Sequence, residues 1–130
     1  MTRLLRGLSL LSALLLAGLI YYLSDQPMVA IPQVFDYQDK ALHVAAYFVL
    51  GFLGLGAMRA GIHGYSIGQA GLAFLITGLY GVLDEYHQSF VPGRHATISD
   101  VVADLTGALL GVGVLFLLVR RYARRTAAVV

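Results

Sequence analysis

Four long apolar runs divide this 130-residue chain, and they constrain its fold more than any other feature. The runs span residues 4–23, 41–58, 66–83 and 101–119. As a helix rising about 1.5 Å per residue, each is long enough to cross a hydrocarbon core about 30 Å thick. Since backbone polar groups in lipid must be satisfied within the segment, we expect helices rather than strands. The sequence therefore predicts an all-α, polytopic membrane protein: a single domain over residues 1–130 that forms a bundle of four transmembrane helices.

The composition supports a membrane location and excludes two classes of site. Hydrophobic residues make up 58% of the chain and charged residues 12%, whereas a soluble domain carries about 25% charged residues. The 15 glycines point the same way, because glycine is more frequent in membrane helices than in soluble ones. The chain has no cysteine, which excludes a disulfide framework and thiolate metal sites.

The first apolar run follows Arg3 and Arg6, as the apolar segment of a secretory signal peptide would. The run is longer than the roughly 7–15 residues of such a segment, and no small-residue cleavage site precedes Ser24. We therefore expect this run to be retained as a membrane anchor.

The charged residues are divided unequally between the two sides that four spans define. Lys40 and Arg94 lie on one side, and the other seven basic residues lie on the opposite side: Arg3, Arg6, Arg59, Arg120, Arg121, Arg124 and Arg125. Because basic residues in short loops favour the cytoplasm, we expect both termini to be cytoplasmic. All seven acidic residues lie at or near the outer boundary: Asp25, Asp36, Asp39, Asp84, Glu85, Asp100 and Asp104. Polar side chains are therefore concentrated at the outer leaflet.

The start of the second run carries three polar residues at helical spacing. Asp39, His43 and Tyr47 recur at i, i+4 and i+8, which places them on one face of the expected helix. An unpaired polar group in lipid is costly, so His43 and Tyr47 should face protein or a water-filled cleft. Taken alone, a tyrosine at the position of Tyr47 would most often be an interfacial or packing residue.

The third run ends in a second polar segment. Asp84 and Gln88 share a helix face at i and i+4, and Glu85 lies beside them. Pro92-Gly93 is a tight-turn signal in which glycine supplies a positive φ. We expect this turn to direct Arg94 back toward the helix ends.

The fourth run begins with two carboxylates. Ser99 or Asp100 is a candidate N-cap, and Asp100 and Asp104 lie on one face four residues apart. Asp104 falls inside the apolar run, and an intramembrane carboxylate is a candidate site residue with Arg94, Lys40 or His43 as its partner. Farther along, Gly107 and Gly111 form a small-xxx-small pattern that permits close helix contact. Together the segments predict one polar cleft at the outer leaflet.

These segments resemble the VanZ-like family of small bacterial membrane proteins over residues 36–115. The residues that carry the resemblance are Asp39, Lys40, His43 and Tyr47, followed by Glu85, Gln88, Pro92-Gly93-Arg94, Ser99, Asp100 and Asp104. Asp104 departs from the family pattern, which usually has asparagine there. The resemblance implies a bacterial cytoplasmic-membrane protein and a link to tolerance of teicoplanin, a glycopeptide antibiotic that acts on cell-wall precursors outside the membrane.

The residues allow a binding or catalytic site for a membrane lipid or lipid-linked cell-wall precursor. His43, Glu85 and Asp100 are the candidate catalytic groups, with His43 as general acid or base. The candidate substrate-binding residues are Asp39, Lys40, Tyr47, Asp84, Gln88, Arg94 and Asp104. Among them, Arg94 offers a planar fork for phosphate and Lys40 a second positive charge.

The alternative is a structural role, in which the outer acids pair with Lys40 and Arg94 to pin the loops, and the protein acts without turnover. A divalent-cation site remains a further hypothesis, but no HExxH spacing is present, so no metal ligand or cofactor is assigned. Nucleic acid is not an expected partner. Reaction type, substrate identity and oligomeric state stay open.

Overall fold

The computed structural model describes residues 3–27, 32, 34–58, 60 and 64–127. Over these residues the chain is all-α and forms four helices: α1 (Arg3–Ser24), α2 (Gln38–Gly56), α3 (Ile67–Gln88) and α4 (Ile98–Ala127). Each helix covers most or all of one predicted apolar run. Arg59, counted above among the inner basic residues, lies outside the described residues.

Three of the described helices, α1, α3 and α4, are long and apolar enough to cross a membrane. The first turns of α2 carry Gln38, Asp39, Lys40 and His43, which lower the hydropathy of that helix. Large apolar side chains are exposed along the outer faces of the bundle, as on Leu14, where a soluble protein would place polar ones. These features indicate a membrane protein.

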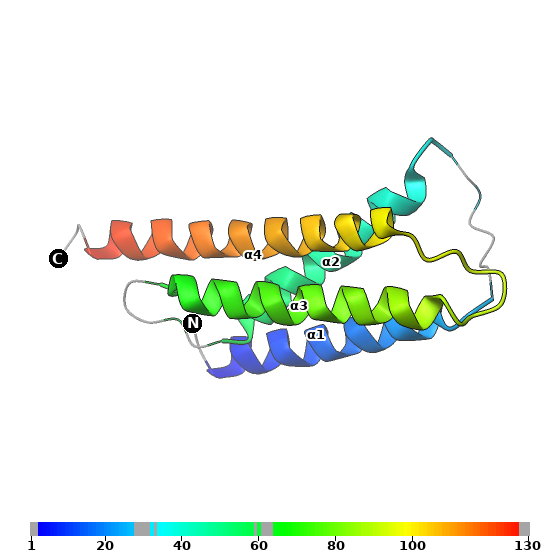
Figure 1. The fold of residues 1–130 in the computed structure, drawn as a ribbon. Coiled ribbons are helices and arrows are strands. Elements are labelled where there is room, and N and C mark those ends of the chain that lie inside the picture. The colour runs from blue at the N-terminus through cyan, green and yellow to red at the C-terminus, as the bar shows by residue number, and fades with distance from the viewer. Residues whose placement is uncertain (1–2, 28–31, 33, 59, 61–63, 128–130) are drawn as a thin grey trace.

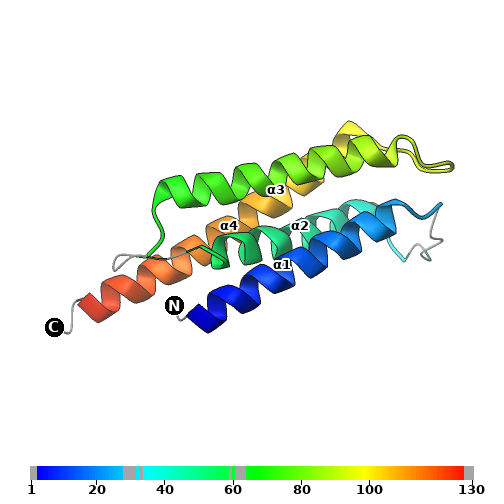
Figure 2. The ribbon, with the colours of Figure 1, turned by 90° about the horizontal axis from the view of Figure 1, so that it is seen from below.

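The helices run alongside one another so that their ends gather into two groups (Figure 1). The first turn of α1 and the last turn of α4 lie at one end of the bundle (Figures 1 and 2). The last turns of α1 and α3 and the first turns of α2 and α4 lie at the other end (Figure 1). The polar segments are therefore collected at one end.

The most extensive helix contact is between α2 and α4, and glycines make it possible. A Cβ atom on Gly107 would lie 2.9 Å from the Phe48 backbone nitrogen and would overlap the Val44 carbonyl oxygen. A Cβ atom on Gly111 would overlap the Phe48 carbonyl oxygen in the same way. The predicted close contact at Gly107 and Gly111 is confirmed: the two backbones touch because these positions have no side chain.

An apolar core fills the bundle toward the end that holds the termini. Its buried members come from α2, α3, α4 and the connection before α3: Leu55, Tyr65, Ala70, Ala73, Val112 and Leu115. Ser66 caps α3 in a reciprocal capping box with Gln69, whose side chain accepts from the Ser66 backbone nitrogen. The core packs α3 beside α4, and the cap defines where α3 begins.

The prediction that Ser99 or Asp100 is the N-cap of α4 is wrong. The helix begins at Ile98, and the Thr97 carbonyl accepts the first helical hydrogen bonds. Asp100 lies within the first turn, where its carboxylate accepts from the Thr97 backbone nitrogen at 3.1 Å and from the Thr97 hydroxyl at 2.6 Å. A carboxylate three residues after the cap accepts from the backbone N–H of the cap residue, which is the second of the two bonds in a capping box.

Candidate functional site

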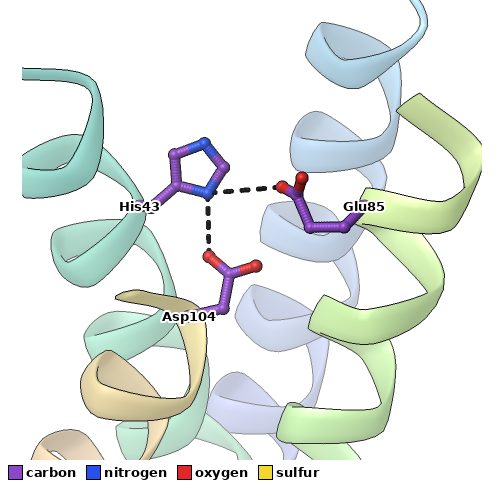
Figure 3. A group of neighbouring side chains, drawn as sticks. All are labelled: His43, Glu85 and Asp104. Atoms are coloured by element: carbon purple, nitrogen blue, oxygen red, sulfur yellow. Dashed lines mark hydrogen bonds and ion pairs between the residues drawn. The ribbon is translucent and has the colours of Figure 1, made fainter. Parts of the chain in front are cut away.

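A histidine and two carboxylates from three helices meet near the polar end of the bundle (Figure 3). His43 is on α2, Glu85 on α3 and Asp104 on α4. The Nδ1 atom of His43 lies 2.8 Å from Asp104 Oδ1 and 3.6 Å from Glu85 Oε1. Of the three partners that the sequence allows for Asp104, the structure places His43 beside it. We call His43, Glu85 and Asp104 the triad cluster.

The two acids of the triad cluster are removed from solvent, whereas His43 is partly exposed. Asp104 is 0% exposed and Glu85 is 4% exposed. Gly81 of α3 leaves room for this arrangement, because a Cβ atom there would lie 2.9 Å from Asp104 Cβ and 3.1 Å from Tyr47 Cε1. Both carboxylate oxygens of Glu85 and the Oδ2 atom of Asp104 have no hydrogen-bond partner among the described residues. Buried polar groups are normally satisfied, so these three oxygens require an explanation.

A chain of charges connects the triad cluster to the start of α2. Lys40 donates to Asp100, and its Nζ atom lies 2.8 Å from Asp39 Oδ2. Asp100 Oδ1 in turn lies 3.9 Å from His43 Nε2. Asp39 precedes the apolar run 41–58, and the Lys40 ammonium beside it holds the pKa of the Asp39 carboxyl below its usual value. Lys40 therefore pairs with Asp39 and Asp100, and among the described residues it makes no ion pair with the triad cluster.

A second polar group joins α1 to α3 beside the triad cluster. Ser24 donates to Asp84 Oδ2 at 2.8 Å, and Gln88 donates to Ser24 Oγ at 3.0 Å. The Tyr47 hydroxyl lies 3.5 Å from the same Asp84 oxygen. Ser24 is buried and was not predicted as a site residue. The available signal was its position as the last residue of α1, at the boundary where the acids gather.

An amphiphilic cleft of about 650 Å³ lies between α1, α2 and α3 at this end. Apolar and polar side chains line it together: Ile20, Leu23, Ser24, Gln38, Asp39, Leu42, His43, Ala46, Tyr47, Asp84, Gln88 and Arg94. His43 thus belongs both to the cleft wall and to the triad cluster. Six of the ten predicted site residues line the cleft, while Lys40, Glu85, Asp100 and Asp104 lie beside it.

Arg94 is turned back toward the helix ends, as the Pro92-Gly93 signal predicts. Gly93 has a φ of 81°. The guanidinium of Arg94 donates from Nε to the Gln26 carbonyl at 3.0 Å and from Nη2 to the Leu23 carbonyl. It therefore joins the loop before α4 to the C-terminal end of α1, where backbone carbonyls have no helical partner.

The arrangement offers donors, acceptors and charge in one partly apolar space. Hydroxyl, amide and carboxylate groups in the cleft can bind a polyol, amine or phosphate group, and His43 can exchange a proton. The apolar wall suits hydrocarbon. These are the requirements of a site for an amphiphile rather than for a soluble polar ligand.

Comparison with known proteins agrees with the resemblance seen in the motifs. The chain has no significant match among curated proteins or among solved structures. The family described as VanZ/LLP1 matches residues 9–120, which include the four helices almost entirely and every residue of the triad cluster. The chain belongs to the VanZ/LLP1 family.

Proposed function

We propose that the protein spans the cytoplasmic membrane of a bacterium four times, with both termini in the cytoplasm and the cleft at the outer leaflet. The basic residues support this orientation, because Arg3, Arg6 and the Arg120–Arg125 segment belong to the end of the bundle opposite the cleft. A fourth span by α2 is supported by its position in the bundle against α4.

We propose further that the cleft binds the headgroup of an outer-leaflet lipid, either a phospholipid or a lipid-linked cell-wall precursor. The observation that carries this proposal is the mixed lining of the cleft. Ile20, Leu23 and Leu42 provide an apolar wall, while Ser24 and Gln88 offer hydrogen bonds on the same space. An acyl chain and its headgroup need both surfaces side by side. The family's loose link to glycopeptide resistance is consistent with a ligand of this class.

Ala46 allows a direct test, because it lines the cleft while its neighbour Ala45 is exposed on another face of α2. Ala46→Phe fills the cleft, and Ala45→Phe adds the same side chain toward the lipid. Native mass spectrometry of the purified proteins should detect bound lipid on the wild type and on Ala45→Phe, with little on Ala46→Phe. Equal lipid binding by both variants would contradict a headgroup site in the cleft.

A structural role is the second candidate, and the hydrogen bonds of Arg94 favour it. A guanidinium that serves two backbone carbonyls at the end of α1 holds the loop in place. Arg94→Lys keeps the charge but loses the planar fork. If the variant loses thermal stability and keeps its lipid, Arg94 is a loop anchor; if it keeps stability and loses lipid, Arg94 contacts the headgroup.

A further inference from the structure

We propose that His43, Glu85 and Asp104 form a binding site for one divalent transition-metal ion of the Zn²⁺ or Mn²⁺ type. The sequence alone did not assign these residues as metal ligands, because they come from three helices and lack any compact ligand spacing. The inference depends on their geometry, their unpaired oxygens and the residues behind them.

The distances within the triad cluster suit a shared ion. One ligand atom from each residue, the His43 nitrogen and a carboxylate oxygen of Glu85 and of Asp104, can be chosen so that all lie within 4.8 Å of one another. Metal bonds to nitrogen and oxygen are about 2.0–2.2 Å long, so two ligands of one ion are separated by at most about 4.4 Å. The 2.8 Å and 3.6 Å separations from His43 Nδ1 fall within that limit. Small side-chain movements would close any separation that lies between this limit and the 4.8 Å upper bound.

The unpaired oxygens are the second observation that indicates a ligand. Glu85 and Asp104 are more than nine-tenths buried, and three of their four oxygens have no hydrogen-bond donor among the described residues. Buried charges are normally paired or bound to a metal. Lys40, which lies nearest in the charge chain, already contacts Asp39 and Asp100. A divalent cation would neutralise both carboxylates while His43 stays uncharged.

The ring nitrogen of His43 that does not face Glu85 and Asp104 has another carboxylate near it. A histidine that binds a metal through one ring nitrogen usually directs the other N–H at a carboxylate. Here Nδ1 faces Glu85 and Asp104, and Nε2 lies 3.9 Å from Asp100 Oδ1. Asp100 is itself held by Lys40 and Thr97. The ring is therefore oriented with its proposed ligand atom toward the two acids.

The ligand set selects the kind of ion. Calcium takes only oxygen ligands, and Mg²⁺ prefers oxygen and keeps several waters. One imidazole with two carboxylates suits Zn²⁺ or Mn²⁺ better. The other histidine–carboxylate pair in the described chain, His87 with Asp25, is partly exposed and supplies only two ligands.

A bound ion would also reduce the negative charge that the acids place at the cleft. Since His43 lines the cleft and its Nδ1 atom faces the buried acids, the ion would lie behind the cleft wall, where its charge would offset the acids that repel a lipid phosphate. This use of the ion rests on the proposed function. The metal site itself does not.

The test uses purified, metal-stripped protein in detergent, titrated separately with Zn²⁺, Mn²⁺ and Mg²⁺. We expect one Zn²⁺ or Mn²⁺ per chain by elemental analysis, a rise in melting temperature, and little response to Mg²⁺. Glu85→Gln and Asp104→Asn should each weaken Zn²⁺ or Mn²⁺ binding at least about tenfold. Asp36→Asn, which changes an exposed acid away from the cluster, should bind as the wild type does.

Stability without metal separates this proposal from a purely structural ion pair. Because neither carboxylate oxygen of buried Glu85 has a hydrogen-bond donor among the described residues, Glu85→Gln should melt at or above the wild-type temperature in metal-free buffer and gain nothing from Zn²⁺ or Mn²⁺. A wild type that takes up neither ion overturns the proposal, as does undiminished binding by both amide variants. Lipid binding with and without metal is then measured by native mass spectrometry. Metal uptake without any effect on lipid would overturn only the phosphate step.

Discussion

Gly107 of α4 lies against the backbone of α2, about one turn beyond Asp104, and its replacement by alanine tests what sets the geometry of the site. The added Cβ atom would lie 2.9 Å from the Phe48 nitrogen and 3.0 Å from the Val44 carbonyl carbon. Ordinary contacts begin at about 3.4 Å, so α2 and α4 must separate by at least about 0.5 Å. Val44 adjoins His43 in sequence, so the movement reaches the 2.8 Å contact between His43 and Asp104.

The energetic effect can be isolated by a control on the same helix. A Cβ atom on Gly113 meets nothing within 4 Å. Both Gly→Ala changes gain the same helix propensity, up to about 1 kcal/mol, so the difference between them reports the contact. Overpacking of this kind costs about 1–3 kcal/mol. We expect Gly107→Ala to be less stable than Gly113→Ala by that amount.

The assay is thermal or denaturant unfolding of both variants in the same detergent, followed by circular dichroism, together with Zn²⁺ titration. Gly107→Ala should unfold earlier and bind the ion more weakly, whereas Gly113→Ala should match or exceed the wild type. Equal stability of the two variants would refute the argument that backbone contact between α2 and α4 positions the site.

Three further substitutions test single contacts. Ser24→Ala removes the bonds to Asp84 and from Gln88. The free energy of unfolding in detergent should fall by about 1–3 kcal/mol, because the buried Asp84 oxygen loses its shortest hydrogen bond. Tyr80→Phe removes the 2.6 Å bond to the Ala17 carbonyl, and a loss of about 0.5–1.5 kcal/mol is expected in the same assay. Lys40→Met leaves Asp100 buried without its cation and should lower the free energy of unfolding by about 3 kcal/mol. Adding Asp100→Asn should restore most of the lost stability. If it does not, the lysine stabilises the protein through another contact.

Much of the architecture follows from the sequence because hydropathy is a local property. The apolar runs predict the four helices, although α3 and α4 extend five and eight residues beyond the predicted C-terminal ends. Gly107 with Gly111 predicts the close α2–α4 contact. The turn at Gly93 could be predicted too, since few residues other than glycine adopt a positive φ. Each of these signals is contained in a short stretch of chain.

The details of the site could not be predicted in the same way, because they depend on how the helices are rotated about their axes. Spacing places Asp104 on a face of its helix. It does not show whether His43, Lys40 or Arg94 is the partner of Asp104. The structure places His43 there, while Lys40 contacts Asp39 and Asp100 and Arg94 reaches the end of α1. The burial of Ser24 likewise depends on the position of α1 against α3, which no local pattern encodes.

The first helix, α1, is held in the bundle with few buried side chains of its own. Ser24 is its buried residue in the described structure, and its leucines are exposed along most of its length. It packs mainly against α2, and its hydrogen bonds to α3 are made by the hydroxyl of Ser24 to Asp84 and the hydroxyl of Tyr80 to the Ala17 carbonyl. A saturation scan should therefore tolerate aliphatic exchange at exposed positions such as Leu11 and Leu14, and become intolerant at Ser24 and at Ser9, which lies against Gly56 of α2. Most exposed positions of this helix can therefore be exchanged among aliphatic residues, whereas its last residue, Ser24, makes a specific contact.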